Sequence, residues 1–385
     1  MSKISMFIKQ IIKCYKRDGF VLTCKRISAR LQRLFWGSTY LLEKEYFNDD
    51  VLHIAFYPSG GLGDYIISRV ILEEVLSHVA CKYKVTLFCD KPEFGKSIYG
   101  DITEDIKLWY EYDRDCYKYD LAFWVEHFVH VDSIKKNRVM VLSSELYQKC
   151  LFIKNNWHDL YVDIERQCFR ERVQFERCRV LGLDRWTELR MGGAFDVAEK
   201  KVFITLSSDY KKKWEKEFSG KRYITINYGA DAMVQGLKQL KMWTVPHYER
   251  LIELIKVTYP TIEVVQLGDK EATAISGVDK TVFGESIEYV KYILKNSLLH
   301  IDCEGGLVHL ATQLEKKCVV LFGPTPVHMY GYDQNINIVS PYCDNCMGLH
   351  DMWAYECYHK HDNAACMEAI TPDMVMDIIK KEKVI

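Results

Sequence analysis

Apolar runs alternate with segments of helical periodicity along most of the chain. The runs that predict strands lie at 53–58, 84–90, 105–112, 120–125 and 138–142, and again at 223–227, 262–267, 298–302 and 318–322. Apolar residues spaced three or four positions apart predict helices at 63–79, 170–181, 246–257, 286–295, 307–316 and 372–381. Apolar strands that alternate with helices are typical of parallel sheets covered by helices. The pattern therefore predicts an α/β protein.

The alternation stops in the glycine-containing stretch at 190–200 and then restarts, which predicts two successive Rossmann-like domains. We place the first domain at 49–195 and the second at 196–340. A basic helical segment at 1–48 precedes them, and a cysteine-rich segment with a final helix follows at 341–385.

Composition narrows the class of protein. The 385 residues are 48% hydrophobic and 27% charged, which is typical of a globular chain and excludes collagen-like and disordered classes. No apolar run reaches the roughly 20 residues that a membrane helix needs, and the first residues lack the pattern of an export signal. We therefore expect a cytoplasmic protein whose cysteines are thiols.

The charge is unevenly distributed. The formal net charge is −1, but 1–34 contains nine lysines and arginines against one aspartate. Apolar residues at helical spacing interleave with these charges and predict one or two basic amphipathic helices. One interpretation is docking on an anionic membrane surface, which would make the protein peripheral on the inner face of the plasma membrane. The other is packing on the body of the protein or on a second subunit. No nucleic-acid-binding module is recognisable, so we expect no nucleic acid partner.

Ligands of open α/β sheets bind beyond the carboxyl ends of the strands. The first such exit contains Gly61 and Gly63 and places Asp64 in the first turn of the following helix. Glycines let a ligand approach the backbone closely, and a carboxylate there suits a general base for a substrate hydroxyl. The alternative is that Asp64 only caps the helix and favours its dipole.

A second exit, at 301–309, also joins a strand to a helix. Gly305 and Gly306 leave backbone N–H groups at the helix N-terminus, which suits a phosphate. Glu304 would repel that phosphate and is better suited to accept hydrogen bonds from sugar hydroxyls. His309, one turn into the helix, is either a donor to a phosphate oxygen or a core histidine against the sheet.

Further exits supply more candidate nucleotide-binding residues. These are Asn227, with Lys238 and Lys241 downstream of it, then Gly268 and Thr325. A lysine that reaches over a strand exit can neutralise a diphosphate leaving group without a metal. Thr325 stands between two prolines and can present a hydroxyl and an N–H to the crevice.

Five motifs at these exits occur in a characteristic order. They are Gly61-Leu-Gly-Asp64, Lys241-Met-Trp243, Gln266-Leu-Gly268, Asp302-x-Glu-Gly-Gly-x-x-His309 and Leu321-Phe-Gly-Pro-Thr325. In these motifs the chain resembles glycosyltransferase family nine, the heptosyltransferases, over roughly residues 50–380. The resemblance implies a GT-B architecture of two Rossmann-like domains that face a cleft. It further implies that the N-terminal domain holds the acceptor and the C-terminal domain holds the nucleotide-sugar donor.

The resemblance also implies roles for single residues. Asp64 matches the catalytic base of the family, and Lys241 matches its diphosphate-binding lysine, with Lys238 as the alternative. The stretch 304–309 matches the phosphate-binding helix start. Many members have one glycine before this helix, whereas this chain has two and is one residue longer. Either Asp302 or Glu304 therefore takes the place of the family's aspartate.

The implied reaction is an inverting transfer of heptose from ADP-heptose onto a hydroxyl of a bacterial surface glycan, such as lipopolysaccharide or capsule. It needs no catalytic metal. The alternatives are a GT-B transferase that uses a UDP- or GDP-linked sugar or modifies a protein acceptor, a nucleotide-sugar epimerase, and a non-catalytic scaffold. The chain is also a candidate for oligomer formation.

Four cysteines crowd the last segment, with the spacing Cys343-x2-Cys346-x10-Cys357-x8-Cys366. Two thiolates three positions apart can bind one metal from a turn, and a second pair completes a tetrahedron. The spacing predicts a structural site for zinc or iron. Reduced free cysteines or a disulfide pair are the alternative. Similar cysteine-rich tails occur in members of the resembled family.

Overall fold

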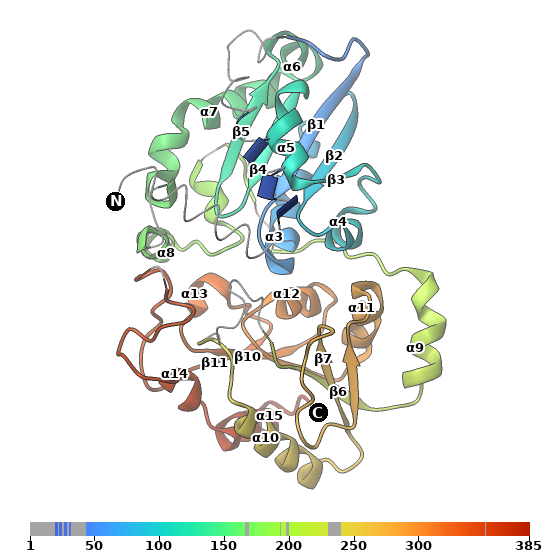
Figure 1. Ribbon diagram of the computed structural model, residues 1–385, viewed down its shortest axis with the longest axis vertical. Helices are drawn as coiled ribbons and strands as arrows, with labels where there is room; N and C mark the ends of the chain where they lie inside the picture. The colour runs from blue at the N-terminus through green and yellow to red at the C-terminus, as the bar shows by residue number, and fades with distance from the viewer. Residues whose placement is uncertain are drawn as a thin grey trace.

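The protein forms two sheets, one above the other in Figure 1, each covered by helices. The computed structural model describes residues 44–165, 169–192, 194–197, 200–229, 240–350 and 352–385, together with 20, 21, 23, 24, 27, 28 and 31. The basic segment predicted at 1–34 lies, apart from those isolated positions, outside the described residues. The predicted α/β architecture with two parallel-rich sheets is confirmed, while the domain boundaries stay predictions.

The first sheet has the strand order β3-β2-β1-β4-β5. Its strands are β1 (Val51–Pro58), β2 (Lys82–Cys89), β3 (Ile106–Leu108), β4 (Leu121–Val125) and β5 (Val129–Ile134). Neighbouring strands run parallel except β4 and β5, which form an antiparallel pair. The central strand β1 is apolar and mostly buried. Its carboxyl end therefore lies at the middle of the sheet, between the ends of β2 and β4.

Six α-helices accompany this sheet in the described residues. They are α3 (Leu62–Ser77), α4 (Pro92–Tyr99), α5 (Trp109–Asp115), α6 (Lys136–Leu142), α7 (Ser144–Glu165) and α8 (Phe169–Leu181). Two predicted strands are corrected here. The run at 138–142 belongs to α6, and the second half of the run at 105–112 belongs to α5. A short mixed apolar run fits one helical turn as well as a strand, and tertiary packing decides between them.

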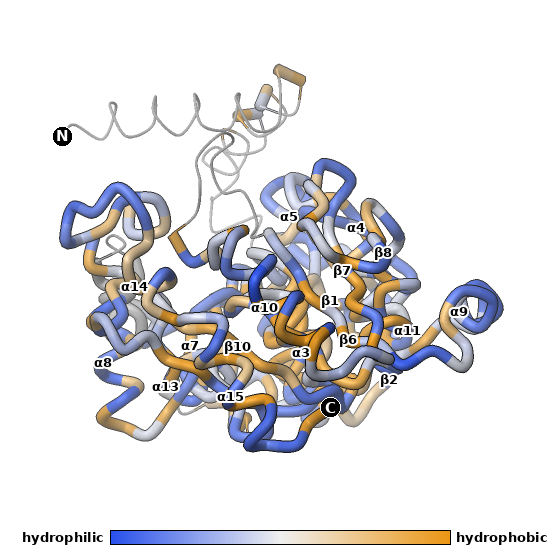
Figure 2. The backbone as a smooth tube through the Cα atoms, turned by 90° about the horizontal axis from the view of Figure 1, so that it is seen from below, coloured by the Kyte–Doolittle hydropathy of each residue, from blue (hydrophilic) through white to orange (hydrophobic). Residues whose placement is uncertain are grey.

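The second sheet is parallel throughout, in the order β11-β10-β9-β6-β7-β8. Its strands are β6 (Tyr223–Asn227), β7 (Glu263–Gly268), β8 (Lys280–Phe283), β9 (His300–Cys303), β10 (Cys318–Phe322) and β11 (Ile336–Val339). The accompanying helices are α9 (Lys211–Phe218), α10 (Val245–Thr258), α11 (Ile287–Asn296), α12 (Gly306–Gln313), α13 (Val327–Tyr330), α14 (Ala365–Glu368) and α15 (Pro372–Glu382). Figure 2 shows hydrophobic residues along inner elements such as β10 and hydrophilic residues on the outlying α9.

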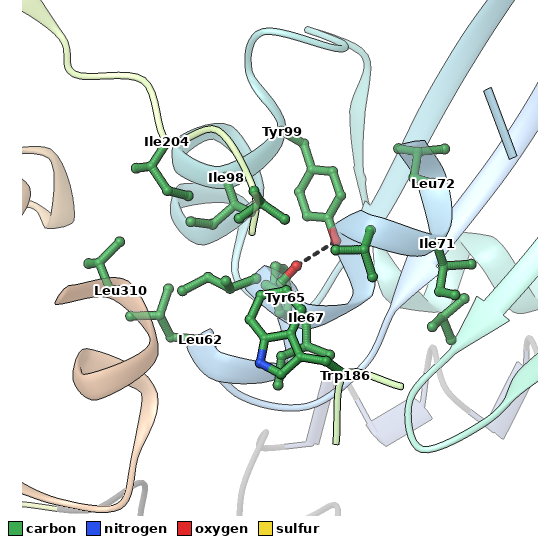
Figure 3. Packing of buried hydrophobic residues seen from close by; sticks show 14 of the residues in the cluster. Leu62, Tyr65, Ile67, Ile71, Leu72, Ile98, Tyr99, Trp186, Ile204 and Leu310 are labelled. Atoms are coloured by element: carbon green, nitrogen blue, oxygen red, sulfur yellow. Dashed lines mark hydrogen bonds between the residues drawn. The ribbon is translucent and has the colours of Figure 1, made fainter. Parts of the chain in front are cut away.

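The two units are in direct contact. The helix that follows the first glycine turn, α3, packs on α12 of the second unit, and Leu62 faces Leu310 across the boundary (Figure 3). The helices α4 and α11 are joined as well, because the N–H of Ile287 donates to Glu93 at 3.0 Å. The buried ammonium of Lys291 donates to the carbonyl of Ser97 at 3.3 Å. The carboxyl ends of the central strands therefore open towards one another.

The described residues contain no helix that is long and apolar enough to span a membrane.

Candidate active site

Asp64 lies in the first turn of α3, directly after the glycine turn that leaves β1. Its Oδ2 accepts a hydrogen bond from the backbone N–H of Gly61 at 2.9 Å, which closes the helix start. The turn depends on Gly60, which has a φ of +109° and where a Cβ would lie 2.3 Å from the same carboxylate oxygen. The capping interaction predicted as an alternative role for Asp64 is present, and it leaves the second carboxylate oxygen for other partners.

The second oxygen of Asp64 is paired with a residue that the sequence did not indicate. Arg185 Nη2 donates to Asp64 Oδ1 at 2.9 Å, and the Arg185 side chain is completely buried while that of Asp64 is 30% exposed. Burial raises the pKa of Asp64, but the charges of Arg185 and His127 and the N–H of Gly61 outweigh it and hold the pKa below its usual 3.8. Asp64 is therefore ionised at neutral pH and reaches solvent.

The glycine turns of the two sheets touch one another. A Cβ at Gly63 would lie 2.5 Å from His309 Cδ2, and a Cβ at Gly306 would lie 2.9 Å from the Cβ of Leu62. Only glycine allows the backbones to come this close. A Cβ at Gly305 would meet only a carbonyl oxygen at 3.8 Å, so this position at the start of α12 stays open to a ligand.

Glu304, Lys241 and His309 form one group at the start of α12. Lys241 Nζ lies 3.7 Å from Glu304 Oε2, and His309 Nε2 lies 3.8 Å from Glu304 Oε1. Burial raises the pKa of Glu304, but the charge of Lys241 and the nearby His309 ring hold it below its ordinary value. Gly63, the neighbour of Asp64 in the chain, lies directly against His309, so Asp64 and this group belong to one site.

Asp302 occupies a different environment. It is 2% exposed, accepts a hydrogen bond from Asn227 Nδ2 at 3.1 Å, and lies 3.5 Å from His300 Nε2. Burial raises the pKa of Asp302. Of the two carboxylates that the sequence left open, Glu304 is the one beside Lys241, and Asp302 with Asn227 lies in the sheet beneath it.

The remaining candidate residues are Thr325, Gly268 and Lys238. Thr325 follows β10 and is buried, and its Oγ1 has no hydrogen-bond partner among the described residues. Gly268 is covered, because a Cβ there would lie 2.5 Å from Ala272 and 3.0 Å from Phe283. Lys238 lies outside the described residues.

The four late cysteines share one neighbourhood beside the exit of β10. The N–H of Cys346 donates to the carbonyl of Pro324 at 3.0 Å, which docks the cysteine-rich loop on the β10 exit. Burial, followed by the neighbouring Cys343, Cys346 and Cys357, raises the pKa of the Cys366 thiol to about 12. None of the four forms a disulfide, and no group of three or more His, Cys, Asp or Glu in the described part of the chain has the geometry of a metal site. The donor set fits a tetrathiolate metal by chemistry.

Comparison with known proteins identifies the fold. No family model and no curated protein matches the chain. Among solved structures, the iron-containing dodecameric glycosyltransferase TibC from enterotoxigenic Escherichia coli matches with a TM-score of 0.53 and 13% identity, covering 86% of this chain and 78% of that one. The complex of TibC, there called a heptosyltransferase, with ADP-D-beta-D-heptose matches with a TM-score of 0.50 and 12% identity, covering 88% and 78%. Heptosyltransferase II of E. coli gives a TM-score of 0.48 at 13% identity over 86% of this chain and 100% of that one. The two TibC comparisons show that the chain has a heptosyltransferase-like, GT-B-type fold.

Proposed function

We propose that this protein is an inverting glycosyltransferase that moves heptose from ADP-heptose onto an acceptor hydroxyl. The observation that supports the proposal is the meeting of an ionised carboxylate from one sheet with a lysine and a helix N-terminus from the other. Asp64 supplies the carboxylate, Lys241 the lysine, and α12 the N-terminus beside Glu304 and His309. These are the groups that a sugar transfer from a nucleoside diphosphate requires.

In the proposed reaction, Asp64 takes the proton of the acceptor hydroxyl, and the acceptor oxygen forms a bond to the anomeric carbon of the donor. The bond from that carbon to the diphosphate oxygen breaks, and its electron pair leaves with the nucleoside diphosphate. Attack opposite the leaving group inverts the anomeric configuration through a transition state that resembles an oxocarbenium ion. Lys241 and the open N–H groups of α12 stabilise the charge that develops on the diphosphate.

Glu304 has a separate role in the proposal. A carboxylate so close to Lys241 cannot itself receive a phosphate, but it can accept hydrogen bonds from donor hydroxyls. Its ion pair also keeps the ammonium of Lys241 in place before the donor binds.

The acceptor is proposed to be a bacterial surface glycan, with a protein hydroxyl as the alternative. Residues 1–34 would hold the enzyme at the anionic inner face of the plasma membrane. TibC is described as a dodecamer, and an oligomer of this chain is proposed on that likeness alone.

We expect ADP release from ADP-heptose to depend on an acceptor. The measurement is a coupled nucleotide assay with purified protein and ADP-heptose, to which glycan or protein fractions are added separately. The fraction that stimulates release identifies the acceptor class. Conversion of the sugar without any acceptor would instead identify an epimerase, and the absence of both reactions would favour a scaffold.

The four cysteines are proposed to hold one structural iron or zinc ion, on the basis of their spacing, their common neighbourhood and the iron that TibC is described as containing. The metal would tie the loop at 343–357 to the start of α14, next to the β10 exit.

We expect Cys346→Ser to lower the metal content of the purified protein and its melting temperature together, because a tetrathiolate site loses one ligand. Elemental analysis measures the metal, and differential scanning fluorimetry measures the melting temperature. Cys81→Ser, which removes a partly exposed thiol elsewhere, is the matched control and should change neither. Wild-type protein with no bound metal and four titratable thiols in this segment would refute the site.

A further inference from the structure

Behind Asp64 lies a group of charged side chains that the reaction above does not use. Its members are His127, Arg185 and Glu188. Arg185 and Glu188 are completely buried, and His127 is 15% exposed. His127 follows β4, whereas Arg185 lies between α8 and the short 3-10 helix η2 (Glu188–Gly192) that Glu188 begins. Segments far apart in the sequence therefore contribute to one buried cluster.

Arg185 is held between two carboxylates. Its Nη2 donates to Asp64 Oδ1 at 2.9 Å, and its Nη1 donates to Glu188 Oε1 at 2.8 Å. Burial opposes the charge of Arg185, but Glu188 and Asp64 outweigh it and raise the pKa of the guanidinium above its ordinary value. Because the guanidinium is planar and rigid, these two bonds fix both its position and its direction.

His127 completes the cluster from the other side. Its Nδ1 lies 2.8 Å from Glu188 Oε1, the same oxygen that Arg185 contacts. Burial and the charge of Arg185 lower the pKa of His127, but Glu188 and Asp64 raise it, and the net result is a pKa above 6.5. A buried carboxylate needs such partners, since an unpaired charge in the interior is strongly destabilising.

The backbone that carries Arg185 is anchored in the second unit. The N–H of Arg185 donates to the carbonyl of Met329 at 2.9 Å, and Trp186 Nε1 donates to the hydroxyl of Tyr332 at 3.0 Å. Trp186 belongs to the same buried cluster as Leu62 of α3 (Figure 3). The Tyr332 hydroxyl also lies 2.5 Å from His309 Nδ1. Arg185 is thus a fixed group against which the more exposed Asp64 is oriented.

We propose that Arg185 is a positioning residue for Asp64, which it holds ionised and oriented to accept the proton of the acceptor hydroxyl, while Glu188 and His127 hold Arg185 in place. The inference rests on the proposed role of Asp64 as the base. Each Asp64 oxygen accepts one bond, from Arg185 or from Gly61, and keeps a second lone pair for the acceptor proton.

The proposal predicts a direction for the pH dependence. The titratable groups that interact electrostatically with Asp64 are Arg185, His127, Glu304 from the β9 exit and Tyr330 of α13. Because Arg185 and then His127 are the strongest influences that lower the pKa of Asp64, removal of the Arg185 charge must raise it. Activity that requires ionised Asp64 is then lost at a higher pH as the solution is acidified.

Two variants of the full chain test the proposal. Arg185→Met combined with Glu188→Gln replaces the ion pair of Arg185 and Glu188 by two uncharged side chains of similar volume. Glu188 is then not left as a buried carboxylate without its arginine. Arg185→Lys keeps the positive charge but lacks the planar fork. The readouts are the Asp64 titration, followed by carbon-13 NMR of labelled aspartate carboxyls and assigned with Asp64→Asn, and the pH profile of turnover.

In the neutral double variant we expect Asp64 to titrate at a higher pH than in the wild type and turnover to fall about 100-fold, as for a misplaced catalytic group. Nucleotide affinity should be unchanged. In Arg185→Lys the titration should return towards the wild type while turnover stays reduced. If the double variant does not fold, this second variant decides through the same two readouts. An unmoved Asp64 titration, or wild-type turnover in either variant, would overturn the proposal. The NMR titration requires no sugar transfer, so a failure of the proposed function is recognised separately.

Discussion

Asp64→Asn is expected to abolish sugar transfer while the protein stays folded and still binds nucleotide. The amide cannot take a proton from the acceptor hydroxyl, and loss of a positioned general base costs about 10²–10⁴-fold in rate. The fold should tolerate the change, because asparagine has the size of aspartate and Arg185 retains its second carboxylate partner, Glu188. The measurement is turnover with saturating donor and acceptor, together with the dissociation constant for nucleotide.

The matched control is Asp373→Asn. Asp373 is also an acidic residue in the first turn of a helix, α15, but it is exposed and belongs to no part of the site. It should leave turnover unchanged. An Asp64→Asn enzyme with turnover near that of the wild type would remove Asp64 from the mechanism.

The second large effect is expected for Lys241→Met. The ammonium, 3.7 Å from Glu304, is placed to meet the charge that grows on the diphosphate as the glycosidic bond breaks. An interaction of this kind acts mainly in the transition state, and the loss of one such group costs about 10²–10³-fold in turnover. We expect kcat to fall more than nucleotide affinity does.

Two variants control for the loss of the Lys241 ion pair. Lys256→Met removes another ion-paired lysine of the second unit, which is 2.7 Å from Asp279, and should leave turnover unchanged. Lys241→Met leaves the carboxylate of Glu304 without its lysine, and this alone can lower the stability of the protein. The double variant Lys241→Met with Glu304→Gln removes that carboxylate, so that a loss of turnover that remains is due to the missing ammonium. Wild-type kcat in Lys241→Met would contradict the assigned role.

The parallel core of the fold is predictable because its strands are continuous apolar runs. The bounds of β6 and β10 agree with those predicted from the sequence. β5 is different: its residues alternate between buried and half-buried, and it pairs antiparallel at the sheet edge. The apolar run at 138–142 instead forms α6. The hydrophobic periodicity of five residues does not distinguish a strand from a helix. The packing of the folded chain decides between them.

The candidate site is predictable at its glycine turns and at Lys241, which the motif Lys241-Met-Trp243 indicates, but the buried partners of Asp64 are not predictable. The turns at Gly61 and Gly305 are visible because a strand, a glycine and a helix follow one another. Arg185 has no local signal, since its partner Asp64 is 121 positions away. The choice between Asp302 and Glu304 likewise depends on which side chain the β9 exit turns towards Lys241, and this is a property of the folded backbone.

The central claim, that the site binds an ADP-linked sugar, is tested most directly by nucleotide binding. Thermal shift with ADP, UDP, GDP and CDP, each with and without its sugar, needs no acceptor, because ligands that bind only the folded protein raise its melting temperature. We predict a shift for ADP and ADP-heptose and none of comparable size for the others. A shift selective for UDP or GDP would contradict the assignment of the donor, and no shift with any nucleotide would contradict the transferase itself.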